Sequence, residues 1–133
     1  MLELEWRIVI QYAYFQDAGY QGLYNMGLSS VKARKGLKQK DDLLDHAGEL
    51  ELSANDFRTK LTEHRLNRNN VKNESDAIET HRSVGAEVRG VILKENGVRP
   101  EDLPIESSIT SRVRRERREL KKRIAPPQIT QGD

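Results

Sequence analysis

The chain has 133 residues, a length typical of one domain, and contains 33% charged but only 35% hydrophobic residues. The formal net charge is only +2, and the absence of cysteine excludes disulfides, thiolate chemistry and cysteine-based zinc sites. The sequence shows no secretory signal and no apolar run near the ~20 residues that span a bilayer, so we expect a cytoplasmic protein with no membrane partner.

The first segment, residues 2–16, is compatible with either a helix or a strand. It is rich in β-branched and aromatic residues, which favours a strand. Leu4, Ile8, Tyr12 and Phe15, however, share one face of a helix. Because the chain offers no second strand to pair with, we predict a helix.

The stretch 12–28 is the aromatic centre of the chain and holds all four of its tyrosines. Three glycines interrupt it, so we predict a loop over 17–27. Exposed tyrosines can stack on nucleic-acid bases. Because the chain has little other apolar bulk, we instead expect Tyr20, Leu23 and Tyr24 to pack in the core.

Two short helices are predicted next, one over 29–35 with a serine cap and one over 41–47, with Gly36 in the turn between them. This outline resembles a helix-turn-helix. It supports an alternative function, a phage antirepressor-like regulator that binds duplex DNA. The basic residues that would contact DNA are Lys32, Arg34 and Lys35.

Two long helices are predicted over 49–69 and 73–95, and their short connection makes them antiparallel neighbours. Asn73 is the expected cap of the second helix, with Asp76 in the capping-box position, and Asn96-Gly97 the expected stop. The apolar face expected for the first helix consists of Leu50, Ala54, Phe57 and Leu61, with Asn55, Arg58 and Thr62 on its polar side. The face expected for the second consists of Ala77, His81, Val84, Val88 and Val91 or Ile92.

A proline-containing loop over 99–106 precedes a strongly basic last helix, predicted over 108–124. Between residues 107 and 126 there are eight basic and two acidic residues, a local charge of +6, so the remainder carries −4. The basic residues are Arg112, Arg114, Arg115, Arg117, Arg118, Lys121, Lys122 and Arg123. They surround the helix, which suits phosphate contact without base reading in single- or double-stranded DNA.

The same helix has a thin apolar stripe that suits pairing with another helix. This pattern supports a further alternative, an oligomerising structural module that forms a homo-oligomer. The stripe consists of Ile109, Val113, Leu120 and Ile124. We expect residues 126–133 to form a disordered tail.

The sequence shows no recognisable catalytic or metal-binding pattern. The histidines, His46, His64 and His81, lack metal-ligand spacing, and we interpret His81 as a hydrogen-bonded core residue. The glycine spacing matches neither a P-loop nor a dinucleotide-binding motif. We therefore predict a non-enzymatic protein without cofactor or metal.

A series of motifs resembles the C-terminal part of the DNA damage-inducible protein D family, in the same order along the chain. The series runs from about Tyr12 to Ile124. It comprises Phe15-Gln16, Gly19 to Tyr24, Arg34-Lys35-Gly36, Leu43 to Asp45, Glu51 to Arg58, Thr80-His81, Val84-Gly85, Val88-Arg89 and Pro100 to Pro104. Family members typically carry an N-terminal domain similar to BRO-type phage antirepressors ahead of this part, and we expect this chain to lack it.

The resemblance implies a cytoplasmic bacterial protein of the SOS response that acts near DNA and a RecA-type recombinase or its filament, with no catalytic residues. Together with the residue patterns, it predicts an all-α fold. We expect a small irregular helical bundle over 1–125, with a long antiparallel helix pair and the basic C-terminal helix.

Overall fold

The computed structural model describes residues 2–124 and confirms the all-α fold: the regular elements of this part are all helical. The elements are α1 (Leu2–Tyr24), α2 (Leu28–Arg34), the 3₁₀ helix η1 (Leu43–His46), α3 (Glu49–Arg68), α4 (Glu74–Asn96), the 3₁₀ helix η2 (Pro100–Asp102) and α5 (Ile109–Ile124). The predicted disordered tail, 126–133, lies outside the described residues.

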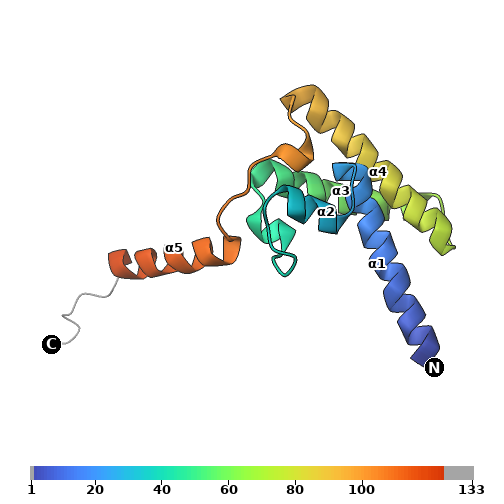
Figure 1. Ribbon diagram of the computed structural model, residues 1–133, viewed down its shortest axis with the longest axis horizontal. Helices are drawn as coiled ribbons and strands as arrows, with labels where there is room; N and C mark the ends of the chain where they lie inside the picture. Colours follow the sequence, from blue (N-terminus) through green and yellow to red (C-terminus); the bar gives the residue numbers. More distant parts are fainter. Residues whose placement is uncertain (1, 125–133) are drawn as a thin grey trace.

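The most extensive helix contact joins α1 and α4, which lie side by side (Figure 1). His81 Nδ1 lies 2.7 Å from the carbonyl oxygen of Phe15, and Arg89 Nη1 donates to the carbonyl of Leu23 at 3.1 Å. Both pairs are 66 residues apart, so the two helices run in the same direction.

The predicted loop over 17–27 is wrong for most of its length, because α1 continues to Tyr24. Gly19 and Gly22, which lie within α1, serve close helix packing instead of a turn. A methyl group on Gly22 would overlap the backbone carbonyl of Arg82, and one on Gly85 would lie 2.7 Å from the carbonyl oxygen of Gly19. Glycine is required here because the two backbones touch. The close packing offsets the stability that a helix loses when glycine stands in its interior.

The first predicted short helix is present as α2, but its cap differs from the prediction. Gly27 is the N-cap residue, and the Asp17 carboxylate accepts the backbone N–H of Leu28 at 2.8 Å from the neighbouring helix. Gly36 follows the helix with a φ of +76°, as expected for a residue after a helix C-terminus. The second predicted short helix is reduced to the single turn η1, capped by Asp42.

Helix α3 is present as predicted, but the apolar face predicted for it is right only for Ala54, which is buried, and Leu61, which packs against the core. Leu50 is 47% exposed and Phe57 is 56% exposed. The buried face consists of Glu51, Ala54, Asn55, Arg58 and Thr62. The polar residues can be buried because the surrounding helices supply hydrogen-bond partners for them.

Helix α4 follows the prediction closely. The Asn73 side chain accepts the backbone N–H of Asp76 at 2.8 Å, and Gly97 ends the helix with a φ of +75°. His81, Val84, Val88 and Ile92 are buried, whereas Val91 is exposed. The hydrophobic core consists of Leu23, Tyr24, Val31, Leu43, Ala54, Val84, Val88 and Ile92, with Tyr20 packed against it.

After α4 the chain returns to the body through η2. Arg89 on α4 donates to the buried carboxylate of Glu101 at 2.6 Å, and Lys35 donates to the carbonyl of Leu103 at 2.7 Å. The last helix, α5, then projects away from the other helices (Figure 1). The body therefore ends in an arm whose main contact among the described elements is with η1.

Candidate nucleic-acid interface

The N-terminus of α5 is attached to η1 by one aspartate. Asp45 accepts the Ser108 hydroxyl at 2.5 Å, the Thr110 backbone N–H at 3.1 Å and the Thr110 hydroxyl at 3.2 Å. These hydrogen bonds, led by that of Ser108, lower the pKa of Asp45. The Glu106 backbone N–H also donates to the carbonyl of His46 at 2.7 Å. The direction in which α5 leaves the body is thus set by polar contacts at its first turn.

No residue of α5 is buried. Even the apolar stripe is open to solvent, since Val113 is 46%, Leu120 49% and Ile124 65% exposed. Among the side chains of residues 11–124, no basic residue of α5 forms an ion pair with a carboxylate. Of these basic residues, Arg112 alone makes a side-chain hydrogen bond to another described residue, donating to the carbonyl of Ser107 at 2.9 Å.

The charges of α5 are therefore available over its whole length. A helix of 16 residues is about 24 Å long. Seven of its cations are exposed, while Arg112 is half-buried. Such a rod of positive charge can neutralise several phosphates of one nucleic-acid strand. The exposed cations are Arg114, Arg115, Arg117, Arg118, Lys121, Lys122 and Arg123.

The other three predicted DNA-contacting residues all make contacts within the fold, but only Lys35 is buried. Lys35 is buried, with its Nζ 3.1 Å from the Glu51 carboxylate, and both side chains are only 2% exposed. Arg34 forms an ion pair with Asp102 at 2.9 Å, and Lys32 donates to the carbonyl of Gln39. Only tertiary contacts reveal this, because all three residues precede Gly36 in a pattern typical of exposed cations at a helix C-terminus.

A buried polar network connects α1, α3 and α4, and the sequence analysis missed it. Tyr24 donates its hydroxyl proton to Glu51, and Asn55 donates to the Tyr24 hydroxyl at 3.0 Å. Arg58 in turn donates to the side-chain oxygen of Asn55 at 3.0 Å. Burial and the neighbouring Glu51 carboxylate raise the pKa of Tyr24, so it stays a neutral donor. The i, i+4, i+7 spacing of the three α3 residues is the signal that could have indicated a buried polar face.

His81 completes this network and is held neutral. The carbonyl of Phe15 can only accept, so Nδ1 carries the proton, and Nε2 accepts a hydrogen bond from Arg58. Burial and the Arg58 charge lower the pKa of His81 from 6.5 to about 4. Arg58 also lies over the Tyr20 ring at 5.0 Å, a cation–π contact. The network is part of the buried core, as expected for His81. Its side chains are all buried and so are not exposed to a substrate.

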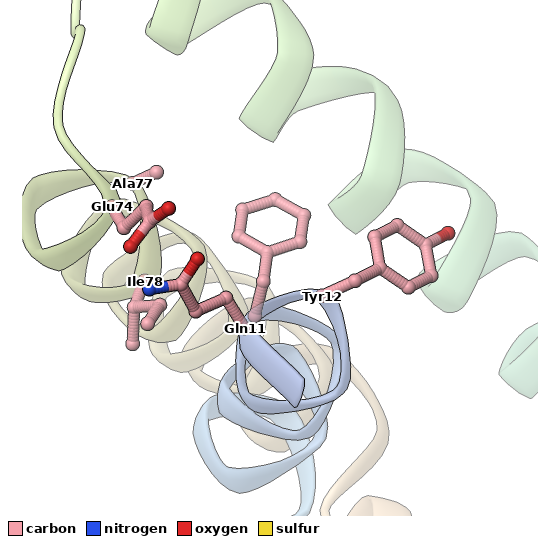
Figure 2. Close-up of a pocket in the computed structure, with 6 residues that line it drawn as sticks. Gln11, Tyr12, Glu74, Ala77 and Ile78 are labelled. Carbon is pink, nitrogen blue, oxygen red and sulfur yellow. The ribbon is translucent and has the colours of Figure 1, made fainter. Parts of the chain in front are cut away.

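An open groove lies between α1 and the beginning of α4 (Figure 2). Gln11, Tyr12 and Phe15 line one side, and Glu74, Ala77 and Ile78 line the other. The lining is mainly apolar and includes a single carboxylate, so it lacks a pair of groups for acid–base chemistry. Among the described residues, no cluster of three His, Asp or Glu side chains could hold a metal ion. No helix in residues 2–124 is both long and apolar enough to cross a membrane.

Comparison with known proteins identifies the family of this chain. The family model for the DinD C-terminal domain matches residues 7–113. The chain belongs to the DinD C-terminal domain family. A relative, DNA damage-inducible protein D of Escherichia coli (strain K12), is 45% identical over 94 residues, which cover 70% of this chain and 34% of the relative. The chain thus spans about a third of that relative's length, and no solved structure matches it.

The match to the DinD C-terminal domain covers the body of the molecule but only the first residues of α5. The body, from residue 7 in α1 through η2, lies within the matched residues, and with it the buried network. Seven of the eight basic residues of α5 lie beyond residue 113. Any role of these charges therefore has to be argued from this chain itself.

Proposed function

We propose that this chain is a non-enzymatic module of the bacterial DNA-damage response that binds DNA phosphates through α5. The observation that carries the proposal is the arm itself. It has a local charge of +6, it forms no ion pair with a carboxylate among the side chains of residues 11–124, and Asp45 holds its first turn. The name of the Escherichia coli relative supports the DNA-damage part of the proposal.

The proposed protein partner is a RecA-type recombinase or its filament on single-stranded DNA. This part of the proposal rests on the family membership. A filament combines a protein surface with a continuous row of phosphates, and α5 suits the phosphates while the body remains free to contact protein. A regulator that reads duplex sequence through this segment is less favoured, because Lys35 is buried and Lys32 and Arg34 already have partners within the chain.

The test is a salt titration of binding to single- and double-stranded oligonucleotides, followed by fluorescence anisotropy. The variant replaces four exposed cations of α5 by glutamine, three of them on the side opposite the apolar stripe and one, Arg114, at its edge. If all four contact phosphates, the slope of log K against log salt decreases by about 3.6 with duplex and about 2.8 with single strands. The changes are Arg114→Gln, Arg115→Gln, Arg118→Gln and Lys122→Gln.

The matched control removes four exposed cations of the body, Lys38→Gln, Lys40→Gln, Arg68→Gln and Lys72→Gln, and so lowers the net charge equally. We expect this control to keep most of the affinity and the slope. Equal loss in both variants, or no loss in the α5 variant, would contradict phosphate binding by α5. Duplexes of different sequence should bind equally well.

The partner is tested separately with purified RecA-type recombinase, with and without single-stranded DNA. We expect the immobilised chain to retain the filament at low salt. Retention of neither recombinase nor filament would rule out this partner without affecting the DNA measurement.

A further inference from the structure

Two helices of this chain expose apolar stripes that share one spacing. On α3 the stripe is Leu50, Phe57 and Leu61; the first two are about half exposed, and Leu61 is partly buried against the core. On α5 it is Val113, Leu120 and Ile124, all exposed. Both sets follow i, i+7, i+11, the spacing of a seam between two packed helices.

The charges beside the two stripes are opposite. On α3, three exposed acidic residues repeat every seven positions along one edge of the stripe, namely Glu49, Asp56 and Glu63. On α5, three cations lie along one edge of the stripe by helical periodicity, namely Arg114, Arg117 and Lys121. Asp56 also pairs with Lys60 at 2.8 Å, but both side chains are about two-thirds exposed, and such a pair contributes little.

Neither stripe can be covered by its counterpart in the same chain. The contacts of Asp45 with Ser108 and Thr110 hold the first turn of α5, and the helix points away from the body (Figure 1). Two α5 helices would not pair with each other either, because each carries a local charge of +6. An α3 helix of a second molecule offers both an apolar stripe to cover that of α5 and an acidic edge of opposite charge.

We propose that α5 of one molecule docks along α3 of a second copy, with Val113, Leu120 and Ile124 against Leu50, Phe57 and Leu61. This contact neutralises the cations at the edge of the stripe. It leaves Arg115, Arg118 and Lys122 on the opposite side of α5. An assembly of two copies thus presents basic residues outward while burying the stripe.

The test is sedimentation velocity of the full chain from about 1 to 100 μM at low salt, without DNA, so that it is independent of phosphate binding. We expect a concentration-dependent increase in mass. Phe57→Ser and Leu120→Ser should each weaken association about tenfold or more, the size of effect seen when an apolar anchor is lost. Val91→Ser removes an exposed apolar side chain outside both stripes and should leave association unchanged.

A pair of charge-reversal variants tests whether α5 of one copy contacts α3 of the other. One variant carries Glu49→Lys, Asp56→Lys and Glu63→Lys, and the other carries Arg114→Glu, Arg117→Glu and Lys121→Glu. Each alone should stay monomeric, whereas an equimolar mixture should associate, because each α5 then meets an α3 of opposite charge. Circular dichroism checks that both variants are folded.

Two results would overturn the proposal. One is a monomeric mass for the unaltered chain over the whole concentration range, which would indicate a different occupant of both stripes. The other is association that survives Phe57→Ser and Leu120→Ser together.

Discussion

Gly22 and Gly85 set the distance between α1 and α4. A side chain on Gly22 would meet backbone atoms of α4, including the amide nitrogen of Ala86 at 2.9 Å. Backbone atoms cannot move away independently, so the helices themselves would have to separate. Gly90 on the same helix α4 has open space around it.

We therefore predict opposite effects for two identical substitutions. Gly22→Ala should lower the free energy of unfolding by about 1–3 kcal/mol through overpacking. Gly90→Ala should raise it by about 0.5–1 kcal/mol, because alanine has the higher helix propensity and meets no neighbour. Urea unfolding measures both, and a loss of stability for Gly90→Ala would contradict the assignment.

His81 is the other residue whose environment makes a clear prediction, this time about pH. Its pKa is lowered to about 4, so between pH 4 and 6.5 the unfolded state binds the proton and the folded state does not. Stability contributed by neutral His81 is thus complete above its ordinary pKa and is lost as pH falls through this window.

The expected loss from His81 between pH 7.5 and pH 5 is on the order of 2 kcal/mol. Urea unfolding at the two pH values measures it. In His81→Gln this part of the pH dependence should disappear, because glutamine does not titrate. His64→Gln, at an exposed position, serves as the control and should keep it.

At the scale of elements, α3 shows how a polar face can become the buried face. Its Glu51 carboxylate lies between Tyr24 of α1 and Lys35, which follows α2, and so joins three segments. Lys35 also donates to the carbonyls of Pro100 and Leu103, next to η2. The position of α3 thus depends on a buried ion pair with additional hydrogen bonds rather than on apolar contact alone.

Removing the Glu51 charge should therefore be costly. In Glu51→Gln the Lys35 ammonium remains buried without its counter-ion, and we expect a loss of about 3 kcal/mol in the free energy of unfolding. The comparison variant is Glu79→Gln, which breaks the more exposed pair with Arg82 and should cost less than about 1 kcal/mol. Thermal unfolding of both variants measures the difference, and equal effects would contradict a buried role for Glu51.

For the whole molecule, the structure separates a packed body from an exposed arm. The body is built on α1 and α4, whereas α5 is held only at its first turn and has no buried residue. Local stability follows the density of such contacts. The arm can therefore open without unfolding the body.

Hydrogen exchange should reveal this division. Under conditions where the chain is monomeric, we expect the amides of α5 to exchange much faster than those of α4 near Val84 and Val88. Asp45→Ala should accelerate exchange in α5 further and leave α4 unchanged, since Asp45 contacts only the first turn of the arm among the two helices. Similar protection in α4 and α5 would contradict the division.

The sequence by itself determined the features that depend on neighbouring residues. The Asn73 cap, the glycines at 36 and 97 and the limits of α3 and α4 follow from local hydrogen bonding and backbone freedom. The basic helix α5 was also predictable, because its exposed charges need no partner in the fold.

Only the tertiary structure decided which groups are buried together. The glycines of α1 looked like a loop because sequence cannot show that a second backbone lies against them. The polar face of α3 and the cation Lys35 looked exposed because their burial depends on partners distant in the chain, namely Tyr24, His81 and the carbonyls near η2. Burial of a polar group is favourable only when such partners are present, and their presence is a property of the whole fold.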